Sequence, residues 1–409
     1  MSIQLTNVFP KPIIRMRSMH FFAMLSFSLL LVSPLISLLC NAQTNTTFQV
    51  GVVLDVDSLV GRIGLTSLSL AASDFYSVNR NYSTRLVLHV RDSRRRVTGA
   101  AASAFLLLKD TEVDAIIGPQ SSAQANFVIG LGDTANVPII SFSATSPSLH
   151  PQTPFFVQTA LHDAAQVDSI AAVVKYFGWS QFVLVYEDSD YGNGILPYLS
   201  NAFQEVNARV SYRCVIPVSA NEDFILKELY KMKTMQTRVF VVHVSSSLAS
   251  KLFPRVKEAE MLSEGYAWIV TSGLMDLFYS LDSNVTESMQ GVLGVKPLVP
   301  GSRKLKSTTV RWKEKFSIDN PNISRAEMNL YGLWAYDTFW ALATAAEKIG
   351  FKEPSLLENT NSTCLSQKYH KPVRNFYGQC VRRRFEGSVG ISDLLIMGNS
   401  SRRHSKYLT

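Results

Sequence analysis

The stretch IIGPQSSAQAN, residues 116–126, shows the pattern that decides the fold of this chain. A short apolar run ends on Gly-Pro, and hydroxyl and amide side chains follow where a helix is expected to begin. The stretch PIISFSATSPSL, residues 138–149, repeats the pattern at once. Successive units of this kind are typical of α/β proteins, so we expect the two turns to lie side by side at one edge of a sheet.

Strands and helices alternate on both sides of this stretch, which predicts parallel sheets with helices on both faces. The first series has strands at 48–56, 85–93, 113–119 and 138–144, with helices at 63–79, 98–110 and 124–134. A second series of similar length begins with a helix at 164–178 and follows without a long linker. The predicted fold class is therefore α/β, a bilobed clamshell of two open parallel sheets, each flanked by helices.

The chain of 409 residues is long enough for two lobes of ordinary size. The apolar helix predicted at 329–350 contains Asp337, Glu347 and Lys348, so we expect it to pack back against the first lobe rather than to cross a membrane. The predicted boundaries are a signal peptide at 1–42, a clamshell at 43–352 with a first lobe at about 48–158 plus 318–352 and a second lobe at about 159–317, and a divergent basic tail at 353–409.

The N-terminus has the order of features of a secretory signal. Lys11, Arg15 and Arg17 precede an apolar run at 21–40, and the small-residue site Cys40-Asn41-Ala42 follows it. We expect cleavage near Ala42 and passage through the secretory pathway, while an uncleaved membrane anchor is the alternative. Glycosylation acceptors of the form N-x-S/T agree with secretion and occur at Asn45, Asn81, Asn284, Asn322, Asn361 and Asn399.

Four cysteines are present, and Cys40 would leave with the signal. In an oxidising compartment Cys364 and Cys380 are the nearest pair, which leaves Cys214 buried and inert in a strand. A bond between chains through one of the three is the alternative. No spacing resembles a zinc site, and no metal or other cofactor is expected.

The formal charge of +8 does not indicate a nucleic-acid binder. The excess lies in residues 1–42 and 368–409, which carry +3 and +7, so the remainder of the chain carries −2. The cluster at Arg94-Arg95-Arg96 is interpreted as a solvated turn, and no nucleic-acid partner is expected.

Polar side chains follow two neighbouring strands of the first series. Ser121 and Ser122 surround the first turn of a helix, where unpaired N–H groups favour an anion such as an α-carboxylate. Ser143 and Thr145 take the corresponding place after the next strand. The alternative is that these hydroxyls only cap helices.

On the facing lobe, the stretch YEDSDYGNG at 186–194 follows a strand and ends in a turn. Tyr191 would cover a ligand there with an apolar ring and a phenol hydrogen bond, or pack beside a glycine turn without one. Asp55 and Asp57 follow the first strand and either face the same cleft or cap the helix that begins near Gly61.

Catalysis has little support in the sequence, and we expect no enzyme. None of the common nucleophile, zinc-protease, phosphate-loop or dinucleotide motifs occurs. His89 and His243 lie inside strand patterns, and His162 beside Asp163 forms no recognisable triad.

Four motifs in order carry a resemblance to a known family: VGVVLDVDSLVGRIGLTSLSLAASDFY, AIIGPQSSAQANFV, VPIISFSATSPSL and FGWSQFVLVYEDSDYGNG. Together they resemble the amino-terminal domain of plant glutamate receptor-like channels, within the wider set of type I periplasmic-binding and atrial-natriuretic-factor-receptor clamshells. The resemblance covers roughly residues 48–352. Full-length members continue into a second clamshell and a cation pore; we expect this chain to lack the pore, and its last forty or so residues to lack the family pattern.

The resemblance also implies a site. In relatives that bind amino acids between the lobes, hydroxyls at the positions of Ser122 and Thr145 and the tyrosine at the position of Tyr191 hold the α groups of the amino acid. The acid that takes the ammonium falls near 271–274, where this chain reads TSGL. The missing carboxylate is a departure from the family pattern.

The function implied by the resemblance is an extracellular, ligand-sensing domain of a glutamate receptor-like cation channel that binds an amino acid or similar small ligand, with receptor subunits as partners. Two alternatives stay open: a module for subunit assembly with an empty cleft, and a truncated fragment without function. A hydrolase is a third class, which turnover dependent on His162 would support.

Overall fold

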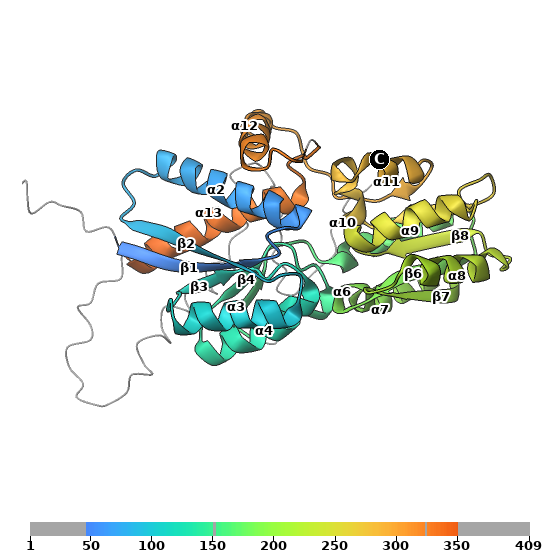
Figure 1. Cartoon of the computed structure of the whole chain (residues 1–409), viewed down its shortest axis with the longest axis horizontal. Coiled ribbons are helices and arrows are strands. Elements are labelled where there is room, and N and C mark those ends of the chain that lie inside the picture. Colours follow the sequence, from blue (N-terminus) through green and yellow to red (C-terminus); the bar gives the residue numbers. More distant parts are fainter. Residues whose placement is uncertain (1–45, 150–152, 324, 351–409) are drawn as a thin grey trace, which may run out of the picture. The chain divides into compact units, whose positions relative to one another are not determined.

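The computed structural model describes residues 46–149, 153–323 and 325–350. Within them, two five-stranded sheets carry the fold (Figure 1). The first contains β1 (Thr46–Leu54), β2 (Thr84–Asp92), β3 (Ala115–Ile117), β4 (Ile139–Ser141) and β5 (Phe156–Gln158). The second contains β6 (Gln181–Asp188), β7 (Arg209–Pro217), β8 (Val239–His243), β9 (Ala267–Val270) and β10 (Leu293–Gly294).

The two sheets have the same topology. The strand order is β2-β1-β3-β4-β5 in the first and β10-β9-β8-β6-β7 in the second. If the five strands of each sheet are numbered in chain order, the second strand lies on one side of the first strand and the third strand lies on its other side. The strand pairs of known register are parallel. This confirms the predicted fold class of two open parallel sheets. In such sheets the strand order reverses between the first and third strands, and loops diverge there to leave a crevice.

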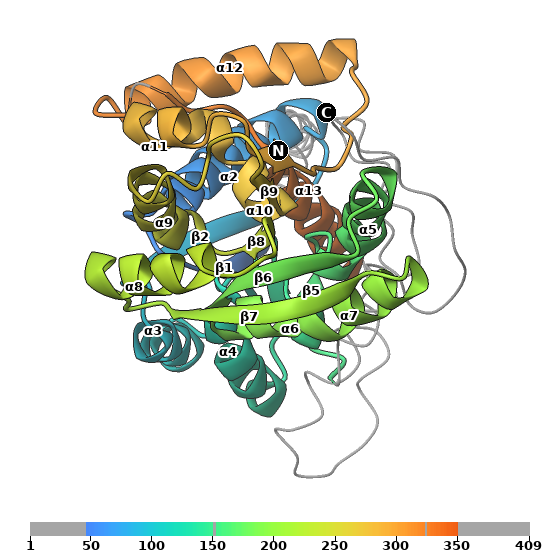
Figure 2. The ribbon, with the colours of Figure 1, turned by 90° about the vertical axis from the view of Figure 1, so that its right-hand side faces the viewer.

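Helices cover both faces of each sheet because the strands are apolar on both sides. In β1, Val52 and Leu54 belong to one hydrophobic core, and Val53 belongs to the core on the other face of the sheet. In β6, Val183 and Phe182 likewise belong to two different cores. Figure 2 shows α8 and α9 on one side of the second sheet and α5 and α7 on the other. The bounds are α2 Leu59–Val78, α3 Val97–Lys109, α4 Ser122–Ala135, α5 Val167–Tyr176, α7 Leu196–Glu205, α8 Glu222–Lys233 and α9 Ser246–Glu258.

Short elements and the two last helices complete the fold. The bounds are η1 Pro147–Leu149, η2 Asp163–Gln166, α6 Asp190–Gly194, α10 Ser272–Met275, η3 Phe278–Ser280, α11 Ser283–Ser288, α12 Arg303–Asp319 and α13 Leu330–Gly350. We call the β1–β5 sheet with its helices the first lobe and the β6–β10 sheet with its helices the second lobe.

The helix α12 packs on the first lobe, although the sequence pattern placed residues up to 317 in the second. The Trp312 indole N–H donates to the Ser67 hydroxyl at 2.8 Å, and Trp312 and Phe316 join the core beneath α2. Arg311 also pairs with Asp74. The chain therefore returns to the first lobe about fifteen residues earlier than predicted, because the apolar side of this charged helix contacts α2.

The apolar helix α13 packs against the first lobe, as its sequence predicted. It contacts α2, and Leu333, Tyr336 and Phe339 are buried in the same core. The buried Glu347 carboxylate accepts the backbone N–H groups of Ser83 at 2.9 Å and Thr84 at 2.7 Å. Within the described part of the chain, no helix combines the length and the apolar character needed to span a bilayer.

Several predictions fall on residues outside the described ranges. They concern the signal peptide, the tail, the cysteine pair and three of the acceptors: 1–42, 353–409, Cys364, Cys380, Asn45, Asn361 and Asn399. Cys214 is buried and unpaired, and burial raises the pKa of its thiol to about 12. The arginines at 94–96 lie in an exposed turn, as predicted.

Candidate functional site

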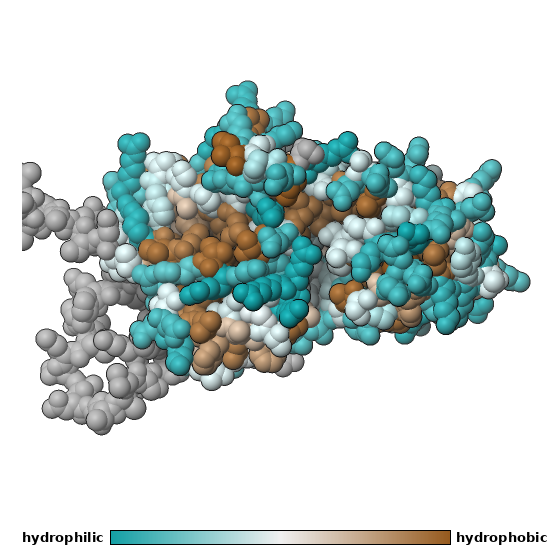
Figure 3. Space-filling model, in the orientation of Figure 1, coloured by the Kyte–Doolittle hydropathy of each residue, from teal (hydrophilic) through white to brown (hydrophobic). Residues whose placement is uncertain are grey.

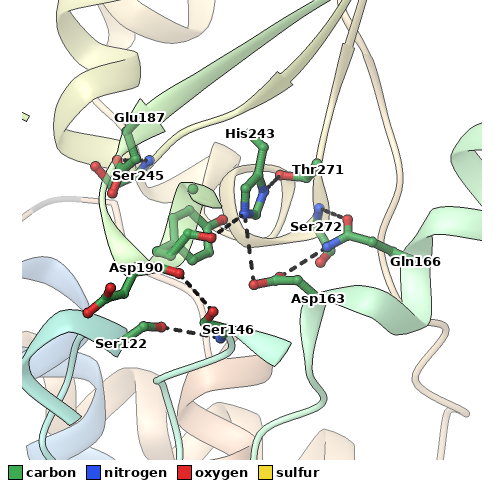
Figure 4. Close-up of polar contacts among 12 residues, drawn as sticks. Ser122, Ser146, Asp163, Gln166, Glu187, Asp190, His243, Ser245, Thr271 and Ser272 are labelled. Atoms are coloured by element: carbon green, nitrogen blue, oxygen red, sulfur yellow. Dashed lines mark hydrogen bonds and ion pairs between the residues drawn. The ribbon is translucent and has the colours of Figure 1, made fainter. Parts of the chain in front are cut away.

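The candidate site lies where the loops after the strands of the two sheets meet. His243 is the last residue of β8, Thr271 directly follows β9, and Tyr191 lies on α6 just after β6. From the first lobe, Thr145 follows β4, and Asp163 lies on η2 in the first crossing between the lobes. Figure 4 shows the contacts of His243, Asp163 and their neighbours.

Asp163 is a buried carboxyl group with one free oxygen. Asp163 is 3% exposed, and its Oδ1 accepts a hydrogen bond from Gln166 Nε2 at 3.1 Å. Among the described residues, Oδ2 has no hydrogen-bond partner. Burial raises the pKa of Asp163 to about 8, despite hydrogen bonds from Thr145 and Gln166 that favour the ionised form. The group is therefore mostly protonated at neutral pH.

His243 is fully buried beside Asp163, and it is neutral. Burial lowers its pKa to about 4. Its Nε2 contacts the backbone carbonyl of Tyr191 at 3.2 Å, which can only accept, so Nε2 carries the proton and Nδ1 accepts from the Thr271 hydroxyl at 2.9 Å. Nε2 is also 3.9 Å from Asp163 Oδ2. Because both groups are uncharged at neutral pH, this contact is not an ion pair.

Gly273 lies in the second-lobe wall, at a position where the Cβ atom of any other residue would be too close to its neighbours. A Cβ atom at this position would lie 2.6 Å from the Tyr191 hydroxyl and 3.3 Å from the Tyr331 hydroxyl. The ring of Tyr191 also packs on His243, with centroids 4.0 Å apart. The segment 271–274, which lacks the acid that the family resemblance predicts, therefore accommodates two phenol groups where a longer side chain would stand.

A second carboxyl group comes from the partly exposed Asp276, which follows α10. Its Oδ2 accepts the backbone N–H of Leu330 at 2.8 Å, so it caps α13 of the first lobe. Burial raises the pKa of Asp276 to about 7, against the effects of the α13 backbone N–H groups and of Lys296. This carboxyl is also largely protonated or close to its midpoint at neutral pH.

Asp163, Gly273 and Asp276 line a small cavity between the lobes. Its volume is about 10 Å³, counted as space for the centre of a water molecule, which is about what one water molecule needs. An amino acid therefore enters only if the walls separate. The lining residues are Thr145, Leu161, His162, Asp163, Ala165, Gln166, Ser272, Gly273, Asp276, Pro297, Leu330, Tyr331 and Trp334.

The lobes also touch directly beside the cavity. The Ser146 hydroxyl donates to the backbone carbonyl of Asp190 at 2.8 Å, and the Ser272 N–H donates to Gln166 Oε1 at 2.7 Å. A Cβ atom on Gly194 would lie 1.9 Å from Ser146 Oγ. The helix α6 therefore rests on the turn that follows β4, and only glycine permits this approach.

The structure separates the predicted site residues into two groups. Thr145 lines the cavity. Tyr191 lies behind the lining residue Gly273, and Ser122 accepts the Ser146 N–H at 3.2 Å without lining the cavity. Ser121 caps α4 in a capping box with Gln124, and the Ser143 hydroxyl donates to the Gln120 carbonyl at 2.9 Å. The capping interpretation thus describes the contacts of Ser121, whereas the Ser143 hydroxyl donates to a loop carbonyl and caps no helix.

The two acids after β1 have structural partners. Asp55 is buried and accepts hydrogen bonds from the Arg95 N–H at 2.8 Å and from Gln124 Nε2 at 2.9 Å. Asp57 is exposed and pairs with Arg62 at 3.3 Å. Neither belongs to the cavity wall described above.

Sequence reasoning missed Asp163, Asp276 and Tyr331. Asp163 was noticed only as a neighbour of His162, and nothing in its local pattern distinguishes it from a helix cap. Asp276 and Tyr331 lie 55 residues apart in sequence and meet only because α10 and α13 come together. Among the described residues, no group of acidic, histidine and cysteine side chains has the arrangement of a metal site.

Comparison with known proteins identifies the family. The model of the receptor family ligand binding region matches residues 64–406, so the match reaches into the tail. Similar curated proteins include Glutamate receptor 2.7 of Arabidopsis thaliana, 47% identical over 316 residues, which are 76% of this chain and 33% of that protein. Glutamate receptor 2.8 of the same plant is 47% identical over 302 residues, 73% of this chain and 32% of that one. The chain spans about a third of the length of these relatives.

Solved structures agree on the fold. The leucine binding protein LivK of Thermotoga maritima matches with a TM-score of 0.67 at 18% identity, covering 84% of this chain and 90% of that one. LivJ of Streptococcus pneumoniae in complex with isoleucine matches with a TM-score of 0.63 at 18% identity, covering 84% and 91%. These relatives are receptors and solute-binding proteins. The chain belongs to the receptor family ligand binding region.

Proposed function

We propose that this member of the receptor ligand-binding family is the extracellular, ligand-sensing amino-terminal part of a glutamate receptor-like ligand-gated cation channel. In this proposal an amino acid or similar small ligand binds between the two lobes. Homology to the plant glutamate receptors supports the receptor role, and LivJ supports the ligand class, since its structure contains isoleucine. The predicted signal and the exposed acceptors Asn81, Asn284 and Asn322 support an extracellular location.

The observation that carries the proposal is the free Oδ2 of Asp163. A buried carboxyl oxygen without a hydrogen-bond partner is costly, because its lost hydration is not replaced. The atom belongs to a residue of the cavity wall, beside Thr145. A ligand ammonium would supply the missing donor and favour the ionised carboxyl. In this proposal Asp163 replaces the acid that is missing at 271–274.

Closure of the lobes would couple binding to signalling. A ligand that contacts both lobes favours the closed form in proportion to its differential affinity for that form. Thr145 and Asp163 come from the first lobe and from the crossing, while Gly273 and Tyr191 come from the second. When the lobes part, α6 leaves Ser146, which opens the turn that follows β4 to an entering ligand.

The test is calorimetric titration of the purified protein with a panel of amino acids. Asp163→Asn, Thr145→Ala and Ser122→Ala are expected to weaken binding by roughly 1–3 kcal/mol each, because each leaves a buried ligand group without a partner. Ser121→Ala is the matched control, since it removes a helix cap and costs about 1 kcal/mol of stability without reducing affinity. A folded protein that gives no heat with any amino acid would overturn the proposal.

A second candidate function is subunit assembly. Phe105 and Leu106 on α3 and Phe127 on the adjacent α4 are 52%, 41% and 55% exposed. Figure 3 shows apolar surface in this region. Exposed apolar patches often mark protein contacts. We expect association in sedimentation experiments that Phe105→Lys abolishes and Asp163→Asn leaves intact, whereas a monomer at all concentrations would exclude this role for the chain alone.

A further inference from the structure

We infer that the cavity selects its ligand by charge, and that Asp276 holds a second positive group on the ligand while acidic side chains are rejected. This inference rests on the proposed function. It names the ligand class as small amino acids with a cationic side chain.

The wall of the cavity contains two carboxyl groups and no Lys or Arg side chain among the residues described. Asp163 and Asp276 both belong to it; Asp163 is buried, and Asp276 is partly exposed. The remaining lining residues are polar, with the titratable His162 among them, or apolar, namely Leu161, Ala165, Pro297, Leu330 and Trp334. A side-chain carboxylate on the ligand would meet no Lys or Arg on this wall and would be repelled by both aspartates when they are ionised.

The two carboxyl groups line the same cavity as the Tyr331 side chain. Both Asp163 and Asp276 raise the pKa of the buried Tyr331, in addition to the effect of burial. The Tyr331 hydroxyl lies beside Gly273 on the opposite wall, 3.3 Å from where a Cβ would stand. In this inference, one small molecule with two cationic ends contacts both carboxyl groups of the shared wall.

The other charged groups near Asp276 do not reverse this selectivity. Lys296 lowers the pKa of Asp276 and Glu327 raises it, and neither lines the cavity. His243 faces Asp163 but is neutral at pH 7 because burial lowers its pKa to about 4. Asp276 also keeps its cap on α13, since a carboxylate has lone pairs for both the helix N–H and a ligand cation.

Three amino acids of similar side-chain length test the inference: ornithine, norvaline and glutamate, which end in an ammonium, a methyl and a carboxylate. Each is titrated into the purified protein by calorimetry. We expect ornithine to bind at least about tenfold more tightly than norvaline, since a charge-assisted hydrogen bond is worth about that much. We expect glutamate to bind most weakly of the three.

Two variants separate the effect of the Asp276 charge on ligand preference from the effects of its helix cap and of other nearby acids. Asp276→Asn keeps an oxygen for the α13 cap but removes the charge, so the preference for ornithine should disappear while norvaline affinity stays the same. Glu327→Gln removes an exposed acid near Asp276 and off the wall, so the preference should persist.

The outcomes distinguish the two proposals. Norvaline or glutamate binding as tightly as ornithine, or a preference that survives Asp276→Asn, overturns the charge inference and leaves the ligand-sensing role standing. No heat with any of the three amino acids, from protein that melts cooperatively, overturns both.

Discussion

Asp276 accepts the backbone N–H of Leu330 at 2.8 Å, so a carboxyl group of the second lobe caps the long helix α13 of the first lobe. The N-terminal N–H groups of a helix have no partner within the helix, and an acid there also interacts favourably with the helix dipole. This cap exists only when the lobes are together. It therefore links the stability of α13 to closure.

The cap predicts the effect of removing this carboxyl. Asp276→Ala is expected to destabilise the closed arrangement by about 1 kcal/mol, the usual cost of a lost cap. The radius of gyration from small-angle scattering should then increase in the absence of ligand. Asp276→Asn is the control, because its amide oxygen still caps the helix. An unchanged radius in the alanine variant would contradict a role of this contact in closure.

Protonation of Asp163 predicts how stability depends on pH. Its pKa is about 8 in the folded protein, above the ordinary value of 3.8. Protonation of the Asp163 carboxyl therefore contributes to the free energy of unfolding. This contribution is fully present below about pH 4 and is lost as the pH rises through about 8. The midpoint temperature of thermal unfolding should therefore decrease as the pH is raised from 6 to 9, a range in which His243 stays neutral. Asp163→Asn should reduce this fall by a few degrees, and an identical fall in the variant would show that other groups cause it.

Ligand binding is expected to release protons. Asp163 is largely protonated at pH 7, whereas an ammonium ligand requires the carboxylate, so binding should expel up to about one proton and tighten as pH rises toward 8. Calorimetry in two buffers of different ionisation enthalpy measures this number directly. Asp163→Asn should bring it close to zero. Equal heats in the two buffers for the unaltered protein would exclude this role for Asp163.

Gly273 predicts a steric effect at the second-lobe wall. In Gly273→Ala the new Cβ lies 2.6 Å from the Tyr191 hydroxyl, well inside contact distance. Tyr191 must then move away from Thr271, which should weaken ligand binding at least about tenfold, as loss of one buried hydrogen bond does. Gly130→Ala is the control, because a Cβ there meets nothing within 4 Å. Normal affinity in Gly273→Ala would mean that Tyr191 takes no part in binding.

The placement of α12 can be tested through its buried tryptophan. Ser67→Ala leaves the Trp312 indole N–H without its acceptor in the core, at a cost of about 1–3 kcal/mol. Denaturant unfolding should show this loss. Ser77→Ala on the same helix is the control, because Ser77 is exposed. Equal stability of the two variants would indicate that α12 does not depend on this contact.

Much of the fold could be predicted from local pattern alone. Strands buried on both faces read as continuous apolar runs, as in residues 50–54, and the helices between them show regular apolar spacing. The strand predicted at 85–93 and the helix at 98–110 agree with the structure to within one residue at each end. The helix predicted at 124–134 instead begins at Ser122, because Ser121 provides the cap.

The two parallel sheets, the order of their elements and the polar turns at their edges can be predicted from the amino-acid sequence, because hydrophobic period and capping chemistry act over short distances. Only the tertiary structure decided which polar residues meet. Asp163, Asp276 and Tyr331 come from η2, from the end of α10 and from α13, and no local pattern links them. Burial then sets their protonation, since loss of water shifts a pKa only once the surrounding elements have packed.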